Sequence, residues 1–200
     1  MMNKQEQNFR RGNTGFTLIE LIVVITILGI LAAIALPKFV ALQTDARIAK
    51  LNAARGAVMA GSAVVHSAFL TRGGVTDVLT CPAGGGFATN TVNGTICTEA
   101  GLITLANGYP ASSALAAAPG GIISSAGLST SAFSPTLAQL NLEGYGAAVA
   151  GTVTTISVIG GPGTGGGVGA QTNATCFFSY TSAAAAGAAP LILALTTTGC

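Results

Sequence analysis

Charge is scarce in this 200-residue sequence, in which 7% of the residues are charged, one is a histidine and none is a tryptophan. After Arg72 there is no Lys, Arg or His, and the only acidic side chains are Asp77, Glu99 and Glu143. A nucleic-acid surface needs clustered Lys or Arg to neutralise phosphates. The sequence therefore predicts no nucleic-acid partner.

Catalytic groups are equally rare. His66 is the single histidine, and no Asp or Cys lies at helical spacing from it, which favours a structural role. Glu99 and Glu143 could form a glycosidase pair, but two isolated acids are more typical of a solvated surface. The glycine-rich segment 160–169 lacks the Lys-Ser/Thr ending of a phosphate loop. We expect no enzyme activity, no catalytic residue and no cofactor.

One long apolar run is present instead. Phe16 to Leu36 has 21 residues, and about 20 suffice for a helix to cross a bilayer. Glu20 is the only charged residue in that run. A carboxylate within lipid costs roughly 2.5–3.5 kcal/mol on insertion scales, so an acid at this position is expected to have a partner.

The segment before the run suggests where that partner comes from. Residues 1–15 are polar, carry three of the eight basic residues, and end in Gly15. A secretory signal is cut after its apolar segment, but here the small residue precedes the run. Cleavage between Gly15 and Phe16 would remove a basic leader, keep the membrane segment and create an amine near Glu20. The remaining chain would hold five basic and five acidic side chains.

The motif GFTLIE, from Gly15 to Glu20, resembles the processing site of type IV pilins and of the pseudopilins of type II secretion. The resemblance implies cleavage before Phe16 by a prepilin peptidase and N-methylation of the Phe16 amine. It also implies that Glu20 pairs with the amine of a neighbouring subunit during assembly. ALPKF at 35–39, DAR at 45–47 and VVHSAFL at 64–70 resemble the mannose-sensitive haemagglutinin type of major pilin.

A single helix is expected from about Phe16 to about Leu70, with Gly29 and Pro37 as its breakers. In pilins the matching stretch can lose helicity on assembly, whereas an ordinary kink at Pro37 is the simpler alternative, and the sequence does not choose between them. Beyond Pro37 one apolar stripe alternates steps of three and four residues: Leu51, Ala54, Val58, Gly61, Val65 and Ala68. The stripe predicts a helix packed on a globular head. A second stripe, expected to be wet or to face neighbours, comprises Asn52, Arg55, Met59, Ser62 and His66.

The rest of the chain divides by composition. Glycines punctuate residues 71–134, which predicts a loop-rich region in which Leu102 to Leu105 form a short strand or a helical turn. Residues 146–159, 176–182 and 191–198 are rich in strand-forming residues, and 183–190 would connect the last two as a hairpin. These segments predict a small sheet.

Four cysteines, Cys81, Cys97, Cys176 and Cys200, lie beyond the membrane segment. Their even number indicates disulfides in an oxidising compartment, and three pairings are possible. The sequential pairing closes the shortest loops, and the resemblance implies a bridge near the chain end. No pair has the close spacing of zinc ligands, so no metal site is expected.

The expected fold is therefore α+β, a pilin fold in which a long N-terminal helix packs on a small antiparallel sheet with disulfide-closed loops. The expected parts are a leader (1–15), a membrane or filament-core helix (16–36), its amphipathic half (37–70), a loop-rich variable region (71–134), and a sheet with a C-terminal disulfide loop (135–200).

The resemblance implies a pilus subunit for attachment or motility, held in the inner membrane before assembly and extracellular afterwards. Its partners would be other copies of itself, the prepilin peptidase and the pilus assembly machinery. The alternatives are a type II secretion pseudopilin or minor pilin, and a membrane-anchored periplasmic enzyme.

Overall fold

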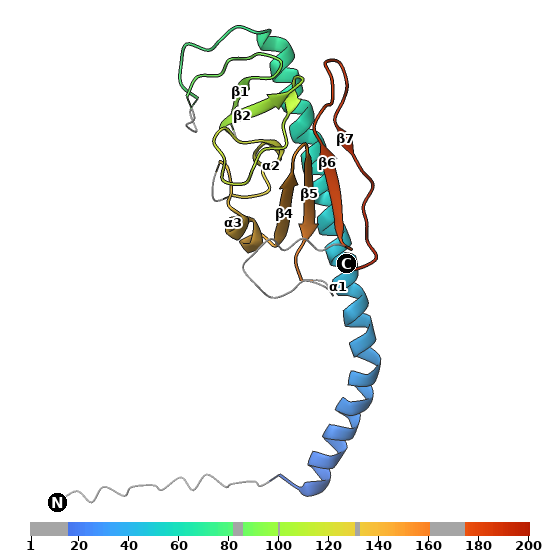
Figure 1. Ribbon diagram of the computed structural model, residues 1–200. Coiled ribbons are helices and arrows are strands. Elements are labelled where there is room, and N and C mark those ends of the chain that lie inside the picture. The colour runs from blue at the N-terminus through green and yellow to red at the C-terminus, as the bar shows by residue number, and fades with distance from the viewer. Residues whose placement is uncertain (1–15, 82–85, 100, 131–132, 161–174) are drawn as a thin grey trace, which may run out of the picture. The chain divides into compact units, whose positions relative to one another are not determined.

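The computed structural model describes residues 16–81, 86–99, 101–130, 133–160 and 175–200. It has the expected α+β fold, with a long N-terminal helix followed by antiparallel sheets (Figure 1). The elements in chain order are α1 (Leu18–Arg72), β1 (Thr95–Thr98), β2 (Gly101–Ala106), β3 (Tyr109–Pro110), α2 (Ile122–Ser125), α3 (Leu137–Leu142), β4 (Tyr145–Ala150), β5 (Val153–Val158), β6 (Phe177–Thr181) and β7 (Leu191–Ile192).

The chain divides into two compact units, Met1–Leu42 and Gln43–Cys200. We call the second unit the head. Helix α1 contributes residues to both units, and its assignment as a helix is continuous through Gly29 and Pro37.

Within the head, α1 buries the face that the sequence predicted. Its buried residues are Leu51, Ala54, Val58, Gly61, Ser62 and Val65. Ala68 is half-buried and packs against the same side. The prediction for Ser62 was wrong. The sequence placed Ser62 on the solvent-facing stripe, but the residue is buried next to Gly61, because the buried face of the helix is wider than a strict three-four alternation allows.

The larger sheet has the order β4-β5-β6-β7, with every pair antiparallel. Its buried face places Ile156 and Phe178 against Leu51 and Val58 of α1, which forms the main core. The hairpin from β6 to β7 was expected, but β7 ends at Ile192 and the predicted strand over 191–198 continues only as a bridge between Phe177 and Thr196.

The smaller sheet has the order β1-β2-β3 and packs on α1 through Val65, Ile96 and Ile103. Leu102 to Leu105 are a strand rather than a helical turn. Strands β2 and β3 are joined by Asn107 and Gly108, both of which have positive φ (55° and 83°). Two central residues with positive φ are what a type I′ hairpin turn requires, and Asn-Gly is its preferred pair.

Two short helices also lie in the head, and neither was expected. The longer, α3, begins with a capping box: Thr136 Oγ1 accepts from the Gln139 amide at 3.3 Å, and Gln139 Oε1 accepts from the Thr136 amide at 2.8 Å. Reciprocal bonds of this kind satisfy two amides that a helix start otherwise leaves unpaired.

Candidate functional site

The first turn of α1 places Glu20 at the positive end of the helix. The Glu20 amide donates to Thr17 Oγ1 at 3.3 Å and to the Thr17 carbonyl at 3.1 Å, so Thr17 caps the helix start. A carboxylate three residues after a capping Thr is favoured by the partial positive charge at a helix N-terminus. Glu20 therefore contributes to helix initiation in the isolated chain, a role beyond the pairing that the sequence predicted for it.

None of the residues that the structure describes covers the apolar segment around Glu20. The most apolar 18-residue window of α1 has a mean hydropathy of 2.9, and none of it is buried. Phe16, the first described residue, is 79% exposed. A contiguous apolar surface of this kind marks contact with a membrane or another protein.

Two other predicted site positions lie in the same unit. A Cβ added to Gly29 would meet nothing within 4 Å, so packing inside the subunit does not require a glycine there. Pro37 stands inside the helix although it cannot donate the usual backbone hydrogen bond. Gly15 and the rest of the predicted leader lie outside the described residues. Cleavage and N-methylation therefore remain predictions, as does any melting between Gly29 and Pro37.

Basic side chains of α1 donate hydrogen bonds to backbone carbonyls in the rest of the head. Arg55 Nε donates to the Leu193 carbonyl at 3.2 Å, and Arg72 donates to that of Cys97 at 2.7 Å. Arg47 and Lys50 donate to the carbonyls of Cys200 and Glu143. Because the sequence has no Lys or Arg after Arg72, the helix supplies all the cationic donors of the head.

His66 also donates a hydrogen bond from α1 to a backbone carbonyl of the head. Its Nδ1 lies 2.9 Å from the Gly108 carbonyl, which can only accept, so the proton is on Nδ1. The imidazole also stacks on Tyr109, with the ring centroids 3.8 Å apart and the planes 5° from parallel. The position agrees with the structural role expected for this histidine.

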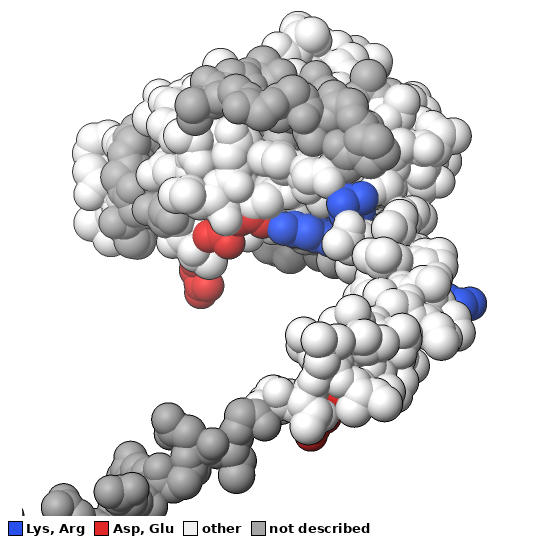
Figure 2. Space-filling view, turned by 90° about the horizontal axis from the view of Figure 1, so that it is seen from below, with Lys and Arg blue, Asp and Glu red and all other residues white. Residues whose placement is uncertain are grey.

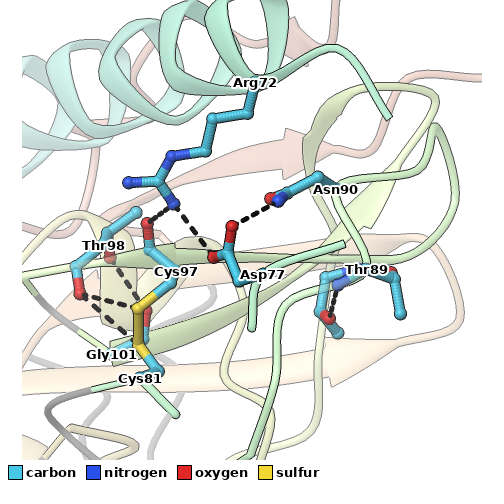
Figure 3. The surroundings of a disulfide bond; sticks show 9 residues. Arg72, Asp77, Cys81, Thr89, Asn90, Cys97, Thr98 and Gly101 are labelled. Carbon is cyan, nitrogen blue, oxygen red and sulfur yellow. Dashed lines mark hydrogen bonds and ion pairs between the residues drawn. A yellow bond between two sulfur atoms is a disulfide. The ribbon is translucent and has the colours of Figure 1, made fainter. Parts of the chain in front are cut away.

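Both disulfides follow the sequential pairing, one of the three that four cysteines allow. Cys81 bonds to Cys97, and Cys176 bonds to Cys200. Around the first bridge, the Arg72 guanidinium lies between the Cys97 carbonyl and the Asp77 carboxylate, which is 3.6 Å away (Figure 3). Asn90 donates to Asp77 at 2.8 Å. The second bridge lies in the main core of the head.

The three acids that follow α1 in the sequence have different surroundings. Asp77 pairs with Arg72, Glu99 is exposed at the turn after β1, and Glu143 accepts from Thr130 at 2.8 Å. Burial, and secondarily the Glu143 charge, raise the pKa of Tyr145 above its usual value. Among the described residues no three His, Cys, Asp or Glu gather as metal ligands.

Few charged side chains are visible on the head in Figure 2, and most of its described surface in that view is uncharged. This distribution leaves the exposed start of α1, with Glu20 as its one charge, as the most distinctive candidate site in the described chain.

Comparison with known proteins bears on this N-terminal segment. Residues 10–36 match the family model described as the prokaryotic N-terminal methylation motif. The chain is 52% identical over 50 residues to the type IV narrow pilus major component PilA5 of Thermus thermophilus, which covers 25% of this chain and 43% of that protein. It is 54% identical over 39 residues to the type IV major pilin protein PilA of Myxococcus xanthus, which covers 20% of this chain and 18% of that protein.

The aligned part of the chain thus spans less than half the length of these relatives. No solved structure matches the chain significantly. The N-terminal segment is thus similar to those of the two type IV pilins, and the long helix with its antiparallel sheets and two disulfides has the expected pilin-like α+β arrangement.

Proposed function

We propose that this chain is a structural subunit of a type IV pilus filament, a major pilin without catalytic activity. The observation that carries the proposal is an apolar helix start, unburied within the subunit, that bears a single acid in its first turn inside a methylation motif. Both curated relatives are named as major pilus components, which supports the major subunit over a secretion pseudopilin or a minor pilin.

The proposed sequence of events begins at the inner membrane. A prepilin peptidase removes residues 1–15, and the new Phe16 amine is methylated. The basic leader stays on the cytoplasmic side, because Lys and Arg flanking a span favour that side. The head folds outside, where an oxidising compartment permits its two disulfides.

Assembly then moves the apolar part of α1 from lipid into a bundle of identical helices. The transfer gains little hydrophobic free energy because both surroundings are apolar, so specific contacts must set the register. An ion pair between Glu20 of one copy and the Phe16 amine of the next is such a contact, since each charge is costly alone in an apolar medium.

Two finer assignments belong to the same proposal. The segments at 35–39, 45–47 and 64–70 support a subunit of the mannose-sensitive haemagglutinin type, with surface attachment or motility as its output. A Cβ added at Gly29 would meet nothing within 4 Å in the subunit, and Pro37 lacks an amide proton. Both observations support Gly29 to Pro37 as the stretch that bends or unwinds in a filament.

The test is Glu20→Ala, made in the producing bacterium in place of the natural copy. We expect a normal amount of subunit in the membrane fraction and at least about a tenfold loss of sheared surface filaments, a factor equivalent to ~1.4 kcal/mol. Filaments at the level of the unmodified strain would refute the proposal.

A further inference from the structure

The charged side chains of α1 differ in whether they have a partner within the subunit. Arg47, Lys50, Arg55 and Arg72 each donate to a backbone carbonyl of the head. Lys38 and Asp45 are exposed, and neither has a hydrogen-bond or ion-pair partner among the residues that the structure describes. Glu20, at the start of the helix, likewise has no ion-pair partner among the described residues.

We propose that Lys38 of one copy pairs with Asp45 of an adjacent copy, as a second ion pair across the helix interface of the filament. The inference rests on the proposed function, because it requires the helices of several copies to pack together. Helix packing removes water from exposed side chains, and an isolated charge taken out of water is costly unless an opposite charge meets it. Lys38 and Asp45, which lack partners within the described part of the subunit, carry opposite charges.

Their spacing on the helix suits this pairing. Lys38 and Asp45 are seven residues apart on α1. Seven residues fall about 20° short of two full turns, so both side chains lie on nearly the same face of the helix. A neighbouring helix that contacts one of them can therefore contact the other.

The axial offset of two copies also agrees with the first ion pair. At a rise of about 1.5 Å per residue, pairing the Phe16 amine of a first copy with Glu20 of a second shifts the two helices by ~6 Å. The same shift leaves Lys38 of the first copy only three residues, or ~4.5 Å, from the level of Asp45 of the second. A flexible four-carbon lysine stem can cover that remainder.

The geometry also gives the interface a direction. In the opposite sense, Lys38 of the second copy would lie eleven residues, or ~16 Å, from the level of Asp45 of the first, which is beyond reach. The copy that offers its amine to Glu20 is therefore the one that offers Lys38 to Asp45. Two cations of one helix meet two acids of the next, which excludes a register that is shifted the other way.

The competing role for Lys38 is at the membrane surface. It lies two residues after the apolar run, where a lysine can keep its ammonium group in the headgroup region while its stem stays in lipid. In that role Lys38 needs a positive charge but no acid at position 45.

Charge exchange separates the two roles. The full chain is expressed in the producing bacterium without its natural copy, as Lys38→Glu, Asp45→Lys or both together. Sheared filaments are quantified and divided by the amount of subunit in the membrane, which corrects for any loss of folded protein. Each single reversal places like charges opposite one another, which is unfavourable at an interface. We expect each to lower the filament yield at least about tenfold, equivalent to ~1.4 kcal/mol.

The exchanged variant decides the question. Restoration to within about threefold of the natural yield, a difference of less than ~1 kcal/mol, is the expected result. Normal yields for the single reversals would overturn the pair, and so would an exchanged variant no better than the worse single reversal, the outcome for a membrane-surface lysine.

Two matched controls and one parallel strain complete the design. Glu99→Lys changes the net charge by the same amount as Asp45→Lys, but at an exposed acid outside α1, and is expected to assemble normally. Lys38→Arg keeps the charge and is expected to do the same. Glu20→Ala is measured alongside: normal assembly by that strain contradicts the proposed function, whereas its failure together with indifferent Lys38 and Asp45 variants contradicts only the second ion pair.

Discussion

At the scale of single residues, Glu20 combines two roles that an alanine substitution removes together. Its carboxylate lies at the positive end of α1, after a capping Thr17, and it is the single acid of the apolar segment. Glutamine also serves at the third position of a capping box, yet it carries no charge. The pair of variants therefore separates helix initiation from ion pairing.

We predict that Glu20→Gln keeps the helix start within about 0.5 kcal/mol of the natural chain but loses filaments as severely as Glu20→Ala. The measurement is the helix content of the detergent-solubilised subunit beside the yield of sheared filaments. Assembly by Glu20→Gln with failure by Glu20→Ala would assign the residue to capping and remove the ion pair from the account.

Gly61 shows how closely α1 meets the head. A Cβ there would lie 2.5 Å from the Ser125 carbonyl oxygen and 2.8 Å from its carbon, which are backbone atoms that cannot rotate away. We predict that Gly61→Ala destabilises the subunit by about 1–3 kcal/mol, the usual cost of overpacking. Thermal unfolding in detergent measures the change.

Gly56 is the matched control on the same helix. A Cβ at Gly56 meets nothing within 4 Å, and the residue is exposed. Alanine favours a helix over glycine by about 0.5–1 kcal/mol, so Gly56→Ala should stabilise slightly. A similar loss from both substitutions would show that helix propensity, rather than contact with Ser125, controls the result.

At the scale of elements, the two disulfides close loops of similar length but lie in different surroundings. The bridges join residues 16 and 24 positions apart, and the chain-entropy contribution to unfolding free energy is about 3 kcal/mol for each. Cys176 and Cys200 are 0% and 4% exposed and belong to the main core. In the other bridge Cys81 is also 4% exposed, but Cys97 is only half-buried, and both belong to a small cluster outside the main core.

We therefore predict that Cys176→Ala with Cys200→Ala lowers the unfolding temperature more than Cys81→Ala with Cys97→Ala does. The first pair of substitutions removes a crosslink and also buried core contacts, each of which costs free energy. An equal or reversed order would mean that the core around Cys176 closes over the lost sulfur atoms.

The elements differ in how far the sequence predicts them. Helix α1 was predictable because an unbroken apolar run and a repeating buried stripe are local patterns with a clear period. The smaller sheet was missed although Asn107-Gly108, placed after Leu102 to Leu105, is a strong hairpin signal. Helix α3 was also missed although Thr136 and Gln139 have capping-box spacing.

Other contacts leave no signal in the sequence. Arg55 and Leu193 are 138 residues apart, and the acceptor is a backbone carbonyl that every residue possesses. The sequence shows the basic residues of α1 only as charges, because their use as donors to backbone carbonyls depends on the folded positions of loops. The burial of Ser62 was equally unpredictable, because it depends on how wide a face of α1 the rest of the head covers.

At the scale of the whole molecule, the low charge suits a polymer of identical copies. Every surface charge recurs on each copy, so an unpaired excess of one sign would repel along the whole filament. From Phe16 onward the chain has five basic and five acidic side chains, and four of the basic ones bind backbone carbonyls within the subunit.

The most direct test of the central claim is the intact mass of the subunit in filaments sheared from the cell surface. We predict a chain that begins at Phe16, is one methyl group heavier than the unmodified polypeptide, and is two hydrogens lighter for each of its two disulfides. Filaments whose subunits still carried residues 1–15, or sheared filaments that lacked this chain, would contradict the account.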